Sequence, residues 1–382
     1  MKVKEFEQEK EADEIIQEKP IIKPFDTRNI KISNSVITLD NMVKRLKYNE
    51  IDLNPDFQRN ANLWDNTKMS RLIESMILKL PLPVFYFDVS DNNKWVVIDG
   101  LQRLSTIKDF VVDKKLRLKN LEFLSELEGK KFDELGRNIQ RIIEETQLIT
   151  YQMEPQTPKE VRYSIFSRIN TGGLILNPQE IRQALNQKHR GVKLLKEITE
   201  EKTFINIVRI TSKRMLDREL VLRFIAFKKC NYNEFYEKRV TLPKFLDETM
   251  EEIDTKEFEF QEFSHLKNSL LDTLIFLRKI FNEDTLFNKK LIDESKTRTL
   301  NRSLFEVWTV LISNLSDKER ESLLSKKNIL IQKYCSLLKM PRFNDAITTG
   351  TNDRKTVITR FALLEELIKE IIYDKKFEIA KL

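Results

Sequence analysis

Glycine is scarce in this chain. Among 382 residues there are 7 glycines, whereas average usage of about 7% would give roughly 27. Three of them, Gly100, Gly172 and Gly173, fall in two short polar segments flanked by regular patterns. Glycine is favoured where the backbone needs a positive φ or must approach a ligand closely. These two segments are therefore the first candidates for a binding site.

Histidine and cysteine are scarcer still. The two histidines, His189 and His265, argue against an HNH nuclease centre and against a multi-histidine zinc site. The two cysteines, Cys230 and Cys335, form no CxxC pair and no disulfide framework, which favours a reducing cytoplasm. The chain has no apolar run near eighteen residues and no apolar stretch at its beginning, so we expect neither a membrane span nor a signal peptide.

The chain has many charged residues but a modest net charge. Lys and Arg number 67 against 60 for Asp and Glu, a net charge of +7. The first twenty residues hold four Lys and seven Asp or Glu, so an acidic arm precedes a more basic body. That distribution permits a surface for nucleic acid or phosphate, and an ordinary solvated surface explains it equally well.

The hydrophobic pattern predicts three regions. Residues 1–30 form a flexible or helical arm, residues 31–185 an α+β domain, and residues 186–382 an all-α domain. In the α+β domain the pattern predicts a strand and a short helix over 36–50 with Asp40 as N-cap, a helix over 66–80, a hairpin over 84–98, a helix from 101 and a strand over 147–153. It also predicts helices on either side of 170–175, and the second of these should begin with a capping box of Asn177 and Glu180.

The second half carries helical periodicity almost throughout. We expect helices over 215–230, 242–255, 265–282, 300–315, 317–339 and 354–375. The predicted fold class is therefore α+β, with a small mixed sheet followed by a mainly α-helical C-terminal region.

Residues 99–103, Asp-Gly-Leu-Gln-Arg, form the most informative motif. A predicted buried strand feeds a tight turn and a helix N-terminus, which presents backbone N–H groups to an anion. Arg103 has the bidentate fork that suits phosphate. Gln102 would position a phosphate or a water, and Asp99 would bind Mg²⁺ or act as a base. The alternative is a capped helix after a strand, with Asp99 as the N-cap.

Two further motifs combine basic and amide side chains. Gln58 and Arg59 lie on a turn-rich loop before Trp64, where the alternative is a surface loop with anchored aromatics. The second motif follows a predicted helix, and its glycine pair could form a nest of N–H groups for an anion or a simple helix C-cap. Its residues are Arg168, Asn170, Thr171, Gly172 and Gly173.

Taken in order, these motifs resemble the N-terminal domain of GmrSD-type modification-dependent restriction proteins, a ParB/sulfiredoxin-like group. The family marker Asp-Gly-Gln-Gln-Arg corresponds to residues 99–103, and Pro-x-x-Gln-Arg to 55–59. The signature Phe-x-Arg-Ile-Asn-Thr-Gly-Gly corresponds to 166–173. The resemblance covers about 35–185. Leu101 departs from the marker, which removes one polar contact.

The resemblance implies a ParB-like domain that binds a nucleoside triphosphate, in some members hydrolyses it, and serves defence against phage or foreign DNA. It implies that Asp99, Gln102 and Arg103 form the nucleotide or modified-phosphate site. Our first hypothesis makes these three residues catalytic, with Mg²⁺ and NTP as cofactors and Asp99 as the metal ligand. The residues that would bind nucleotide or phosphate are Gln58, Arg59, Gly100, Arg168, Asn170, Thr171, Gly172 and Gly173.

Three functions remain open on the sequence. The first is a nucleotide-binding, NTP-hydrolysing sensor of a restriction or anti-phage system. Because the sequence shows no HNH nuclease motif of the kind found in full-length relatives, DNA cutting would require a separate nuclease subunit or an unrecognised carboxylate-based centre. The second is a non-catalytic DNA-binding or adaptor module acting with such a subunit, and the third is a metal-dependent nuclease.

Overall fold

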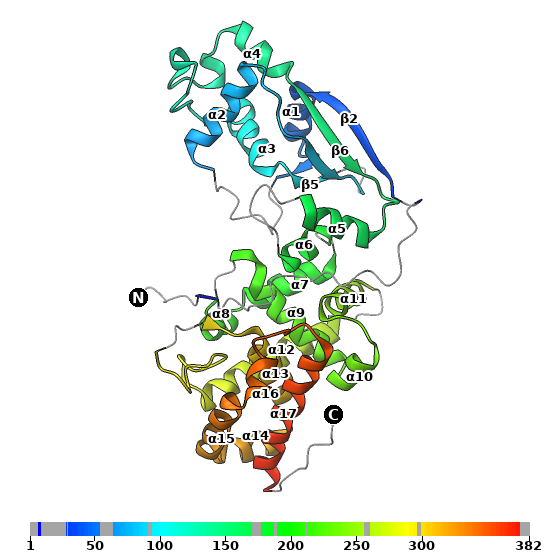
Figure 1. Cartoon of the computed structure of the whole chain (residues 1–382), viewed down its shortest axis with the longest axis vertical. Coiled ribbons are helices and arrows are strands. Elements are labelled where there is room, and N and C mark those ends of the chain that lie inside the picture. Colours follow the sequence, from blue (N-terminus) through cyan, green and yellow to red (C-terminus); the bar gives the residue numbers. More distant parts are fainter. Residues whose placement is uncertain are drawn as a thin grey trace. The chain divides into compact units, whose positions relative to one another are not determined.

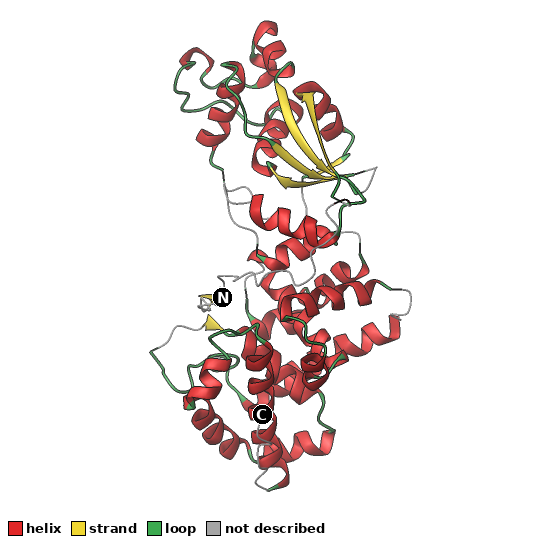
Figure 2. Ribbon diagram, turned by 45° about the vertical axis from the view of Figure 1, so that its right-hand side comes forward, coloured by secondary structure: helices red, strands yellow, loops and turns green. Residues whose placement is uncertain are grey.

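The chain divides into two compact units. The computed structural model describes residues 7–8, 28, 30–53, 64–90, 94–169, 177–186, 189–210, 213–255, 260–295 and 299–374. One unit comprises residues 20–187, and the other comprises residues 1–19 together with 188–382. The first contains the large sheet and the second is almost wholly helical (Figures 1 and 2).

The first unit is built on a five-stranded mixed sheet. Its strand order is β2-β6-β4-β5-β3, with parallel pairing of β4 to β6 and of β3 to β5 and antiparallel pairing elsewhere. This confirms the predicted small mixed sheet and the α+β class. The strands are β2 (Ile32–Thr38), β3 (Ile51–Asp52), β4 (Phe85–Asp88), β5 (Trp95–Asp99) and β6 (Gln147–Met153).

Four helices contribute to the core on one face of this sheet. Phe85 and Phe87 of β4 and Val97 of β5 are fully buried there, and Trp95 of β5 packs in the same core. Helix α3 runs directly into a π-helical turn, Lys108–Val112, which the sequence pattern does not reveal. The helices are α1 (Leu39–Lys47), α2 (Asn66–Ile77), α3 (Leu101–Ile107) and α4 (Arg137–Glu144).

The helix ends follow local capping chemistry. Asp65 caps α2 by accepting the N–H of Lys68 at 2.8 Å. Helix α6 (Pro178–Leu185) begins with the capping box of Asn177 and Glu180 expected from the sequence. The prediction of Asp40 as an N-cap is wrong: Thr38 caps α1, because the helix begins at Leu39.

The second unit packs its helices around one large apolar core. The predicted helix over 317–339 is two helices that meet at Lys326, and four short helices were not predicted: α7, α8, α10 and α16. No helix among the described ranges combines the length and apolarity that crossing a bilayer requires. The helices are α7 (Arg190–Thr199), α8 (Lys202–Val208), α9 (Leu216–Lys229), α10 (Tyr232–Glu237), α11 (Leu242–Asp254), α12 (Phe260–Ile280), α13 (Arg302–Ser313), α14 (Asp317–Ser325), α15 (Lys327–Lys339), α16 (Pro341–Ala346) and α17 (Arg354–Tyr373).

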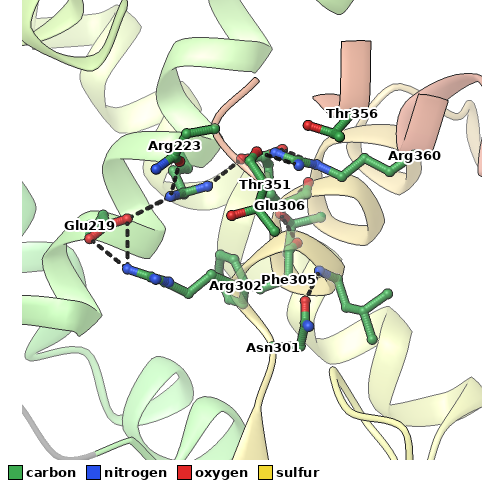
Figure 3. A network of polar contacts seen from close by, with 12 residues as sticks. Glu219, Arg223, Asn301, Arg302, Phe305, Glu306, Thr351, Thr356 and Arg360 are labelled. Carbon is green, nitrogen blue, oxygen red and sulfur yellow. Dashed lines mark hydrogen bonds and ion pairs between the residues drawn. The ribbon is translucent and has the colours of Figure 1, made fainter. Parts of the chain in front are cut away.

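A buried ionic network joins three of these helices (Figure 3). Glu306 of α13 is fully buried and accepts hydrogen bonds from Arg223 of α9 at 3.0 Å and from Arg360 of α17 at 2.7 Å. Arg360 also donates to the carbonyl of Thr351 at 2.6 Å. Each buried charge in the network has a partner of opposite sign, and leaving one unpaired would be costly. Through the bond from Arg360 to Thr351, the network also holds the loop before α17 against the helical core.

Candidate functional site at the turn between β5 and α3

Gly100 makes the turn from β5 into α3. Its φ is +101°, in the left-handed region, and it is the N-cap position of α3 without a side-chain cap. A Cβ at this position would lie 2.5 Å from Cδ1 of Phe85, so both the backbone conformation and the space require glycine. The predicted alternative in which Asp99 caps the helix is not what the turn shows.

Arg103 anchors the turn to the segment that leads into β4. Its guanidinium donates to the carbonyls of Pro83 and Val84, the latter at 3.1 Å. It also donates to Oδ2 of Asp99 at 2.8 Å and lies 4.4 Å from the ring centre of Phe85. The residue is 7% exposed. Burial lowers the pKa of Arg103 from its usual value, and the negative charge of Asp99 opposes that shift.

Asp99 and Gln102 are the half-exposed members of the motif. The side chain of Asp99 is 36% exposed, and Gln102 lies in the first turn of α3. The structure thus brings Asp99, Gly100, Gln102 and Arg103 together at one turn. Arg103 lies on its buried side, where it holds the local backbone, and the carboxylate and the amide lie on the side that water reaches.

The motif of Arg168 and residues 170–173 is described only at Arg168. Arg168 is exposed in the last turn of α5 (Lys159–Ile169), a helix that packs against β5. Near the other end of that helix, Arg162 pairs with Asp88 of β4 at 3.3 Å. The remaining predicted phosphate-binding residues lie outside the described residues: Gln58, Arg59, Asn170, Thr171, Gly172 and Gly173.

Divalent cations have no ready-made cage here. Among the residues that the structure describes, no three His, Cys, Asp or Glu side chains converge as a metal site would require. Asp99 offers one carboxylate whose Oδ2 is engaged by Arg103. A single carboxylate is compatible with Mg²⁺ that is held mainly by nucleotide phosphates. The assignment of Asp99 as a metal ligand stays a prediction.

Comparison with known proteins places this turn inside a recognised domain. Residues 39–187 match the model of the GmrSD restriction endonuclease N-terminal domain, and this range contains every candidate site residue discussed above. No curated protein and no solved structure is significantly similar to the chain. Over residues 39–187, the sheet unit is thus similar to the GmrSD restriction endonuclease N-terminal domain.

Proposed function

We propose that this protein is a nucleotide-binding sensor component of a DNA-modification-dependent restriction or anti-phage defence system, acting in the cytoplasm. The observation that carries the proposal is the turn at Gly100, inside a domain whose family is named for a restriction endonuclease. DNA is the proposed partner that is sensed, and a separate nuclease subunit is the proposed partner that cuts.

The turn has the features of a phosphate site. No side chain caps α3, so no capping group competes with an anion for the backbone N–H groups of the first helical turn. Gln102 stands in that turn and is half-exposed. In this proposal the phosphates are bound by backbone N–H groups and by Gln102, because Arg103 is already engaged by two carbonyls and Asp99.

Asp99 and Arg103 have different proposed roles. Arg103 positions the turn and adds positive charge beneath it, which favours a nearby phosphate. Asp99 is accessible to solvent, so it can orient a water or share Mg²⁺ that arrives with the triphosphate. Hydrolysis in this scheme rests on positioning and charge neutralisation, without a covalent nucleophile.

The test measures NTP binding and turnover by the whole chain with Mg²⁺, for each of the four NTPs, with and without plain or modified DNA. We expect Asp99→Asn to lower turnover by about 10²-fold or more while binding persists. Asparagine keeps an oxygen that can accept from Arg103, so the turn should stay intact. Gln102→Ala should weaken binding.

Matched controls are available in the same unit. Asp40→Asn changes an exposed aspartate that also pairs with a cation four residues later, Lys44 at 2.8 Å. Gln147→Ala changes an exposed glutamine at the start of β6. Both controls should behave like wild type. The nucleotide proposal fails if the wild-type chain binds no NTP. Binding without turnover under any condition would instead favour the adaptor function.

A further inference from the structure

Two tyrosines lie on the sheet face that is turned away from the core of α1 to α4. Side chains alternate along β4, so Phe85 and Phe87 enter the core and Tyr86 points to the opposite face. Tyr86 lies in register with Tyr151 of β6 on one side and with Asp99 of β5 on the other. Adjacent residues in register share a face, so Asp99, Tyr86 and Tyr151 form one row across three strands.

A β-bulge creates this row. The register of β4 and β5 shifts between Tyr86 and Phe87, which leaves Ile98 as an extra residue on β5. Without the bulge, Ile98 would be the residue opposite Tyr86, and Asp99 would be directed elsewhere. Bulges commonly redirect a side chain next to a functional site. Here the bulge places the solvent-accessible carboxylate of the turn beside an aromatic ring.

The two rings are stacked and half-exposed. Their centroids are 5.3 Å apart and their planes differ by 14°. Neither tyrosine belongs to the buried core. Two residues further along β4 the same face is closed, because Asp88 is buried and paired with Arg162 of α5. The tyrosine pair therefore lies between a covered part of the sheet and the half-exposed turn.

The spacing suits one ligand that reaches both features. Neighbouring strands are about 4.8 Å apart, so Tyr86 and Tyr151 are one and two strand spacings from Asp99. That is within the span of a single nucleotide whose phosphates occupy the turn. Aromatic side chains next to a phosphate site are suitable partners for a base, since every base has a π-face that stacks on them.

The geometry points to Tyr86 and Tyr151 as the stacking platform for a nucleobase whose phosphate is held at the turn of Gly100. This inference rests on the proposed function. The base can come from two sources that share this chemistry, a free nucleoside triphosphate or an unpaired base of DNA.

The test compares ligands with and without a base. Calorimetry measures the affinity of the wild-type chain, Tyr86→Leu and Tyr151→Leu for NTP, for inorganic tripolyphosphate and for a single-stranded oligonucleotide. We expect each leucine variant to bind the base-containing ligand about tenfold more weakly or worse, and tripolyphosphate as well as wild type. Tyr86→Phe and Tyr151→Phe keep the ring and should restore most of the affinity.

A third tyrosine provides the control. Tyr48 is 77% exposed and precedes Glu50 by two residues. The carbonyl of Glu50 accepts the N–H of Trp95, which begins β5, whereas Asp99 ends that strand. Tyr48 is therefore near the other end of β5 from the turn. Tyr48→Leu should bind every ligand like wild type. Weakening confined to NTP or to the oligonucleotide identifies the source of the base. If both leucine variants bind every base-containing ligand as tightly as the unmutated chain does, the inference is overturned and the nucleotide proposal still stands. If the unmutated chain binds none of these ligands, both are overturned.

Discussion

Glu306 and Arg360 form an ion pair that is completely enclosed in the helical unit. Nη2 of Arg360 lies 2.7 Å from Oε1 of Glu306, and neither side chain has any exposed area. Arg223 approaches the other carboxylate oxygen of Glu306 at 3.0 Å. The carboxylate thus compensates two buried guanidinium groups at once, and this relationship leads to the first prediction.

Glu306→Gln should destabilise the helical unit strongly. Removing one partner of a buried ion pair leaves an uncompensated charge and costs about 3–5 kcal/mol. Denaturant unfolding followed by circular dichroism measures the change. The control is Lys333→Gln, which removes a half-exposed pair with Glu370 and should cost at most about 1 kcal/mol. Equal costs for the two variants would mean that burial does not set the strength of the network.

Gly100→Ala should distort the turn between β5 and α3. The new Cβ would be forced against the ring of Phe85, and a non-glycine residue would have to hold φ at +101°. Gly129→Ala separates these two effects, because Gly129 also has a positive φ, of +77°, but has no atom within 4 Å of the added Cβ. We expect Gly129→Ala to cost about 1–2 kcal/mol and Gly100→Ala to cost clearly more, measured by thermal unfolding. A Gly100→Ala variant as stable as Gly129→Ala would rule out the clash.

Arg103→Lys should loosen the turn although the charge is kept. A lysine ammonium cannot reproduce the fork that reaches the carbonyls of Pro83 and Val84 and the carboxylate of Asp99 together. Hydrogen bonds that involve a charged group contribute about 1.5–3 kcal/mol each, and lysine would lose at least one of these part-buried bonds. We expect this loss in chemical unfolding, together with weaker NTP binding.

The matched control for Arg103 is Arg71→Lys. Arg71 pairs with Glu122 at 2.9 Å and both side chains are half-exposed, so lysine should serve equally well there. Unchanged stability and unchanged NTP affinity in Arg103→Lys would contradict the positioning role.

Glu74 should make the sheet unit less stable in acid. Burial raises its pKa, but hydrogen bonds from the N–H groups of Glu122, Phe123 and Leu124, at 3.0, 2.7 and 2.9 Å, outweigh that effect, and the pKa is lowered overall. A carboxyl with a lowered folded-state pKa stabilises the fold above its unfolded pKa and loses that contribution as pH falls through the folded value.

The corresponding measurement is the free energy of unfolding between neutral pH and pH 3, for wild type and Glu74→Gln. Wild type should lose stability below the usual titration range of glutamate. The glutamine variant should be less stable at neutral pH and should show a smaller loss in acid, because it carries no titrating carboxyl at this position. Parallel pH curves for the two proteins would show that Glu74 has no part in the acid sensitivity.

Much of the local structure was predictable because it depends on neighbours in the chain. The strand over 147–153 and the capping box at Asn177 follow from alternation and from side chains three residues apart, and both appear as predicted. The division of 317–339 at Lys326 was missed because the apolar pattern continues through the break. The cap of α1 was misplaced from Thr38 to Asp40 because both residue types can accept a backbone N–H in the first turn of a helix.

The candidate site shows a similar limit. The order of motifs indicated the domain and the turn at Gly100. The sequence pattern also predicted that Arg103 binds phosphate directly, and it gave no sign of the contacts that hold this side chain. Its contacts with Pro83 and Val84 join residues about twenty positions apart. The sequence did not predict the pairing of Tyr86 with Tyr151. Tyr86 is one of three consecutive aromatic residues in a strand, and Tyr151 is 65 positions away along the chain.

The sequence by itself determined the α+β class, the helical second half, the glycine turn and the domain family, because each depends on residue type and on short-range spacing. Only the tertiary structure decided what those residues touch. The enclosure of Glu306 between Arg223 and Arg360, the burial of Arg103 and the row of Asp99, Tyr86 and Tyr151 all arise from strand register and helix packing. Such contacts join segments that are far apart in the sequence, so they cannot be predicted from patterns among neighbouring residues.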